Sequence, residues 1–192
     1  MDWTTSCPDW RRRIISGESL VPVKPLFPAE AEAALEVFKS LKAIDVPQVP
    51  DEDGLRFQTL GEICRPWVFD FVAAIFGAYD AESGRRLINE FLLLISKKNG
   101  KSTIAAGIMV TALILNWRYS AELTILAPTI EVAKNSADPA MGMVQHDPEI
   151  FDILKPIPHL KAIEHRTSGS VLKIVAADSE TVAGGKSSFV LI

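Results

Sequence analysis

Apolar positions along the chain fall into short runs and into helix-like stripes. Short runs bounded by turn residues predict strands over 87–95, 123–127 and 189–192. Stripes spaced by three and four residues, with their start signals, predict helices over 29–44, from Pro66, over 103–116, from Thr129 to about 144, and from Asp147 to near 156. Strands that alternate with helices predict an α/β fold with a mainly parallel sheet and helices on both faces, a three-layer sandwich.

The remaining segments add a hairpin, an arm and a linker. Runs at 161–166 and 171–177, joined by a polar turn, predict a hairpin. Four prolines within 1–28 predict an irregular N-terminal arm, and 179–188 reads as a polar loop. The proline- and acid-rich stretch 46–54 predicts a linker. We therefore divide the chain into an N-terminal arm and helix, 1–54, and a core, 55–192.

The segment behind the first apolar run carries the clearest chemistry, with Ser96, Lys97, Lys98, Asn99, Gly100, Lys101, Ser102 and Thr103. A strand that enters a Gly-Lys-Ser turn and then a helix has the layout of a phosphate-binding P-loop. Backbone N–H groups of such a loop form an anion cradle with the helix N-terminus. Lys101 would reach the β- and γ-phosphates of ATP, and the Ser102 hydroxyl would hold Mg²⁺.

The motif departs from the full P-loop pattern at its first position, where Ile95 replaces glycine. A polar strand–helix turn that contains lysines by chance is therefore the alternative. A second glycine–lysine run at 184–188 precedes a strand instead of following one, so we interpret it as a loop near the active site or DNA.

Composition limits the class of protein. The chain has 192 residues, of which 48% are hydrophobic, enough for one compact α/β domain. A formal net charge of −4 means that any DNA contact must be local. Cys7 and Cys64 are too few for a disulfide framework or a Cys-based zinc site and fit a reducing, intracellular setting. No apolar run reaches the roughly 18 residues of a spanning helix, and we expect no membrane partner and no secretion signal.

Other candidate residues have simpler explanations. The run 11–13 of three arginines could touch a phosphate backbone, but a solvated charge run explains it equally well. The three histidines are too scattered for a zinc site. Glu62, Asp178 and Glu180 have no partner that marks them as catalytic.

Taken together, these segments resemble the large terminase subunits of tailed phages, in particular the HK97-like group. The run 96–102, without its first glycine, resembles their variant Walker A motif. Residues 64–67 resemble the segment that packs near the adenine, 123–129 the second strand and turn, and 178–192 the loop and strand that enter Walker B. The resemblance extends from about Cys7 to Ile192.

The resemblance implies a P-loop NTPase fold of the ASCE type and an ATP-driven motor that threads viral DNA into a procapsid. It implies ATP and Mg²⁺ as cofactors, residues 96–103 and Trp67 as the nucleotide site, Ser102 as metal ligand, and Lys101 and Lys97 as catalytic residues. Lys97 stands where the family often has arginine and lacks that residue's bidentate fork. Lys98, Arg85 and Arg86 are alternatives for contact with the γ-phosphate.

The resemblance also implies partners: double-stranded viral DNA, a portal protein, the small terminase subunit and a homo-oligomeric ring, in the cytoplasm of a host bacterium. The family's Walker B acids and nuclease domain do not follow Ile192 here, so we expect a piece of a longer protein with little hydrolysis of its own. A non-catalytic nucleotide-binding or interaction module, and another P-loop ATPase or kinase, are the alternatives.

Overall fold

The computed structural model describes residues 7–18, 20–21, 25–80, 82–176 and 186–192. The chain divides into two compact units. The first unit comprises Met1–Val37 and Cys64–Leu94, and the second comprises Phe38–Ile63 and Ile95–Ile192. No helix in the described part of the chain is long and apolar enough to cross a membrane.

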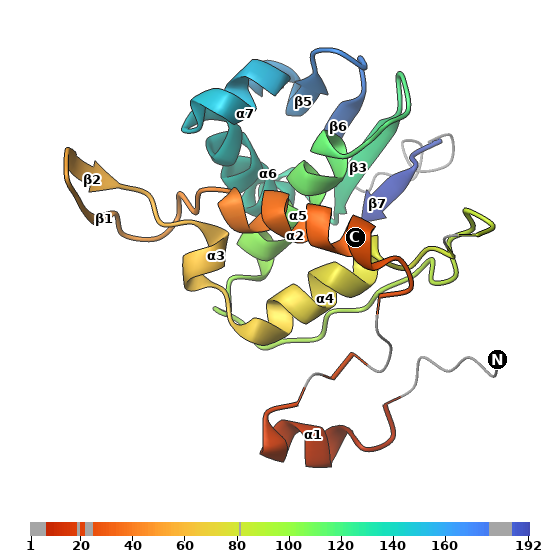
Figure 1. Cartoon of the computed structure of the whole chain (residues 1–192). Coiled ribbons are helices and arrows are strands. Elements are labelled where there is room, and N and C mark those ends of the chain that lie inside the picture. The colour runs from red at the N-terminus through yellow and green to blue at the C-terminus, as the bar shows by residue number, and fades with distance from the viewer. Residues whose placement is uncertain (1–6, 19, 22–24, 81, 177–185) are drawn as a thin grey trace. The chain divides into compact units, whose positions relative to one another are not determined.

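The second unit is built on a five-stranded sheet in the order β4-β5-β6-β3-β7. These strands are β3 (Glu122–Ala127), β4 (Leu154–Ile157), β5 (Ala162–His165), β6 (Val171–Ala176) and β7 (Phe189–Leu191). In the sheet, β3 runs parallel to both β6 and β7 (Figure 1). By contrast, β4 pairs antiparallel with β5, and β5 pairs antiparallel with β6. The α/β class is confirmed, with an antiparallel hairpin extending the parallel strands.

Two helices supply most of the apolar side chains that cover this sheet. α5 (Lys101–Ile114) and α6 (Ile130–Gln145) pack against each other, and both contact β3 and β6. α5 is apolar on almost every side, and nearly all its residues from Thr103 to Leu113 are buried, as expected for a helix enclosed by protein. The core of the second unit therefore lies directly behind the N-terminus of α5.

Short elements complete the second unit. α7 (Pro148–Ile153) and the 3₁₀ helix η1 (Pro158–Leu160) flank β4, and α3 (Leu60–Ile63) follows a separate hairpin of β1 (Val49–Asp51) and β2 (Gly54–Arg56). Thr129 and Asp147 cap α6 and α7 by accepting backbone N–H bonds, as their sequence signals predict. The predicted linker 46–54 thus contains most of a hairpin, and α7 ends at Ile153 because β4 pairs with β5 from Leu154 onward.

The first unit contains α1 (Trp10–Ser16), α4 (Pro66–Phe76) and most of α2 (Pro28–Ser40), whose last residues belong to the second unit. α4 begins at Pro66, as predicted, and buries Val68 and every residue from Val72 to Phe76. The N–H groups of Leu26 and Phe27 both donate to the carbonyl of Gly77. The arm predicted to be irregular contains a helix, α1, which buries none of its residues.

The predicted first core strand, 87–95, is wrong. The segment forms no strand, and the exposed fractions of Leu92 and Leu94 are 86% and 88%. Exposure still alternates from residue to residue across 91–95, as in an extended chain. A strand is defined by its ladder of hydrogen bonds to a neighbour, and the described strands pair with one another without this segment.

Candidate functional site: the loop before helix α5

The candidate phosphate loop is a tight, exposed turn between Ile95 and α5. Lys98 and Gly100 have positive φ angles of 64° and 69°. Glycine adopts this conformation freely, but a lysine there is uncommon and strained. Residues 96–100 are all exposed, whereas the next residues enter the core step by step, with Lys101 and Ser102 half-buried and Thr103 buried.

Asn99 and Lys101 fold the loop back on itself. The Asn99 side-chain amide donates to the Ser96 hydroxyl at 2.7 Å and to the Ser96 carbonyl at 3.3 Å. It also reaches the carbonyl of Lys97 at 3.4 Å. The Lys101 ammonium donates to the Ser96 carbonyl at 3.2 Å. Lys101, which the motif assigns to phosphate, is therefore held beside the start of the loop by one hydrogen bond to the Ser96 carbonyl.

The N-terminus of α5 has the properties of an anion site. Gly100 occupies the N-cap position, and no side chain there accepts a hydrogen bond from the helix. Among the described residues, no acceptor is recorded for the backbone N–H groups from Lys97 to Thr103. Unpaired N–H groups at the positive end of a helix dipole attract anions. An anion bound at the start of α5 would accept hydrogen bonds from these donors.

A carboxylate that sequence reasoning missed lies beside this helix turn. The Thr103 hydroxyl, on a residue only 5% exposed, donates to Oδ2 of Asp45. The two residues are 58 positions apart, and Asp45 stands between the predicted helix 29–44 and the predicted linker 46–54. No local pattern could have revealed the contact, because only the folding of the second unit brings Asp45 to α5.

Several other predicted site residues lie in the first unit. Trp67, on α4, is 36% exposed, and its predicted contact with adenine stays a prediction. The Arg86 guanidinium donates to the Tyr79 hydroxyl at 3.0 Å and lies 4.9 Å from that ring's centroid. This contact gives Arg86 a structural partner within the first unit, and the contact of Arg85 or Arg86 with the γ-phosphate stays a prediction.

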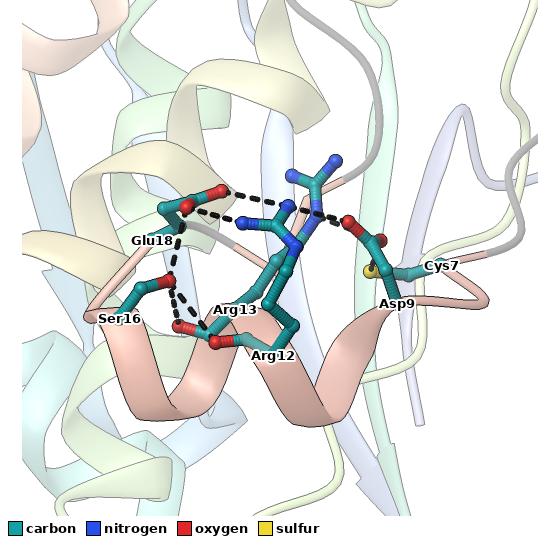
Figure 2. A network of polar contacts seen from close by, with 6 residues as sticks. All are labelled: Cys7, Asp9, Arg12, Arg13, Ser16 and Glu18. Carbon is teal, nitrogen blue, oxygen red and sulfur yellow. Dashed lines mark hydrogen bonds and ion pairs between the residues drawn. The ribbon is translucent and has the colours of Figure 1, made fainter.

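Ion pairs occupy two of the three arginines in the N-terminal arm (Figure 2). Arg12 pairs with Asp9 and Glu18, each at 2.6 Å, and Arg13 pairs with Asp9 at 2.9 Å. Hydrogen bonds from Arg12 and then Arg13 lower the pKa of Asp9 to about 2, and the Arg12 contact also lowers the pKa of Glu18. The charges largely neutralise one another, which favours the solvated charge run over a phosphate-backbone contact.

The second glycine–lysine run lies partly outside the described residues, as do Asp178 and Glu180. Its last two serines are described and anchor β7 to β3. The hydroxyls of Ser187 and Thr124 lie 2.5 Å apart, and the N–H and hydroxyl of Ser188 donate to the Glu122 carbonyl at 2.8 and 3.1 Å. These serines thus have a role in strand docking. Across the described ranges, no group of three His, Cys, Asp or Glu residues could hold a metal ion.

These features describe an α/β unit in which an exposed Gly-Lys-Ser turn leads into the buried helix α5. A family model described as "Terminase large subunit, ATPase domain" matches residues 66–192, more than half of the chain. The chain belongs to this family, as the sequence resemblance implied.

A solved structure supports the same fold. The crystal structure of the HK97 bacteriophage large terminase is similar with a TM-score of 0.62 and 21% sequence identity. The match covers 80% of this chain and 29% of the HK97 protein, so the chain corresponds to less than a third of that protein's length. A search of curated proteins found no match.

Proposed function

We propose that this chain is the nucleotide-binding part of an ATP-driven motor that packages viral DNA, with Mg²⁺–ATP bound at residues 96–103. One observation carries the proposal. Within the described ranges, the N–H groups from Lys97 to Thr103 have no acceptor, and they lie at the N-terminus of a buried helix with Lys101 beside them. Membership of the terminase ATPase family supports ATP as the anion that fills this loop.

The residues of the loop fit a nucleotide and its metal. The triphosphate would accept hydrogen bonds from the loop N–H groups, and Lys101 would exchange its bond to the Ser96 carbonyl for the β- and γ-phosphates. Ser102 is half-buried at the first helical turn, where its hydroxyl is a suitable Mg²⁺ ligand. When bound, Mg²⁺ neutralises charge on the phosphate oxygens.

Further roles follow from the positions of the remaining residues. Lys97 and Lys98 are exposed on the loop, and we assign Lys97 to the γ-phosphate as a point charge. Asn99 would hold the empty loop closed through its bonds to Ser96. From the family resemblance alone, we also assign Trp67 to contact with the adenine.

The whole-protein activity follows from the family and is also a proposal. The intact motor would hydrolyse ATP to move double-stranded viral DNA, acting as a ring with a portal protein and a small terminase subunit in the host cytoplasm. The chain corresponds to 29% of the HK97 large terminase, so nucleotide binding is a more direct test than turnover.

The test is the affinity for Mg²⁺–ATP, measured by isothermal titration calorimetry on the chain and on Lys101→Ala. Lys134→Ala is the matched control, because Lys134 is an exposed lysine on α6. We expect Lys101→Ala to weaken binding about tenfold or more, since it removes a charge-assisted hydrogen bond to phosphate. The control should bind like the unmodified chain. Equal affinity in the Lys101 variant, or no binding by the unmodified chain, would overturn the proposal.

A further inference from the structure

Asp45 joins the second unit's N-terminal segment to the first turn of α5. Its carboxylate accepts a hydrogen bond from the Thr103 hydroxyl. Thr103 directly follows Ser102, the residue that the proposed function assigns to Mg²⁺. The hydrogen bond between Asp45 and Thr103 therefore restrains the first turn of α5. The N–H groups of this turn would bind the nucleotide, and its Ser102 hydroxyl would bind Mg²⁺.

The segment that carries Asp45 is itself held in place. The Ala43 N–H donates to the Gln58 carbonyl at 2.8 Å. Lys42 donates to the His146 carbonyl at 2.9 Å and pairs with Asp147 at 3.4 Å. Ile44 packs directly on Gly142 of α6. Because Ala43 is bonded to Gln58 and Ile44 packs on α6, the backbone that leads into Asp45 is held in place beside α5.

The charge of Asp45 matters as much as its hydrogen bond. Lys42, a nearby cation on the same segment, pairs with Asp147. Thr103 is the third residue of α5, so the Asp45 carboxylate that accepts its hydrogen bond adds negative charge at the positive end of the helix. Such a charge stabilises an empty helix N-terminus. The same negative charge repels a triphosphate that carries no metal. It repels a triphosphate less when Mg²⁺ has neutralised part of the phosphate charge.

We propose that Asp45 is a positioning residue of the phosphate loop. It holds the first turn of α5 through Thr103, and it makes the loop favour nucleotide that carries Mg²⁺ over free nucleotide. The inference rests on the proposed function and extends it to the metal dependence of binding.

The experiment separates the charge from the hydrogen bond. Asp45→Asn removes the charge but keeps an oxygen acceptor, whereas Thr103→Val removes the donor and Thr103→Ser keeps it. Each variant is titrated with ATP in MgCl₂ and again in EDTA. Asp53→Asn is the matched control, since it removes an exposed carboxylate from the turn between β1 and β2. Thermal melting shows that each variant is folded.

Charge removal should change the preference for metal. We expect Asp45→Asn to bind metal-free ATP about two- to fivefold more tightly, which is the range of a charge at a helix N-terminus. Its affinity for Mg²⁺–ATP should change less. The ratio of the affinity for Mg²⁺–ATP to the affinity for metal-free ATP should therefore decrease. Asp53→Asn should keep the ratio of the unmodified chain. A purely structural support would weaken both affinities equally.

Loss of the hydrogen bond should have a different signature. We expect Thr103→Val to weaken Mg²⁺–ATP binding about fivefold, on the scale of one hydrogen bond, and Thr103→Ser to restore most of it. This pair also tests the inference if Asp45→Asn fails to fold.

The outcomes distinguish the two proposals. If Lys101→Ala loses binding but Asp45→Asn keeps the ratio of the unmodified chain, the inference fails and the proposed function stands. An unchanged affinity in Thr103→Val would also overturn the positioning role. If the unmodified chain binds no ATP, both proposals fail together.

Discussion

Replacing Gly107 with alanine tests the packing of α5 directly. An alanine in the middle of a helix is normally favoured over glycine by about 1 kcal/mol. At Gly107, however, an added Cβ would lie 2.5 Å from Cδ1 of Leu60 and 2.8 Å from Cε2 of Phe38. Both side chains are fully buried and have little room to move. Overpacking of this kind costs about 1–3 kcal/mol, so we expect a net destabilisation of about 1 kcal/mol.

The assay is thermal and urea unfolding of the chain and of Gly107→Ala. A net loss of that size should lower Tm by about 2–4 °C. Leu60→Val, which shortens the side chain nearest to the new methyl, provides the control. It should cost less in the Gly107→Ala background than alone, because there it also relieves the clash. A Gly107→Ala chain that melts higher than the unmodified protein would refute the packing of Phe38 and Leu60 on α5.

Two further substitutions and one labelling experiment test the packing and electrostatics of the chain. Thr111 is fully buried, and its hydroxyl has no hydrogen-bond partner among the described residues. Thr111→Val should therefore raise the free energy of unfolding by about 1 kcal/mol in urea titration. A variant with a lower free energy of unfolding than the unmodified chain would mean that the hydroxyl has a partner. Arg56, and then the Thr59 N–H, lower the pKa of Glu62 from 4.5 to about 2. Glu62→Gln should therefore lower Tm at neutral pH. The difference in Tm between the unmodified chain and the variant should shrink as pH falls from about 4.5 to 2, where the native carboxylate gains its proton. A Tm difference that does not change with pH would contradict the ion pair. Burial raises the pKa of Cys64 to about 11. Iodoacetamide should therefore label Cys64 at pH 8 much more slowly in the native chain than in urea, as measured by mass spectrometry. Equal labelling rates in the two conditions would contradict the burial of Cys64.

Local sequence signals located most of the regular elements. Thr129, the Asp147–Pro148 pair and Pro66 mark the starts of α6, α7 and α4. These signals work because a cap or an N-terminal proline acts on backbone groups within a few residues of itself. The apolar run of β3 was also recognisable, because a parallel strand buried on both faces reads as continuous hydrophobic sequence.

The elements that were missed depend on less local properties. α1 buries no residues, so no apolar stripe marks it, and its ion pairs are visible only once the helix exists. The hairpin of β1 and β2 lies in a stretch whose prolines and acids resemble a linker. β4 contains Pro156, which an edge strand tolerates because one side of its backbone has no ladder partner among the described strands.

The sequence by itself determined the order of helices and strands, the position of the Gly-Lys-Ser turn at the start of α5 and the family resemblance. Each of these follows from residues close together along the chain. Only the tertiary structure decided that 87–95 stays outside the described sheet and that Asp45 meets Thr103. Strand pairing and a contact across 58 positions depend on which distant segments the fold brings together, and the local sequence does not encode that choice.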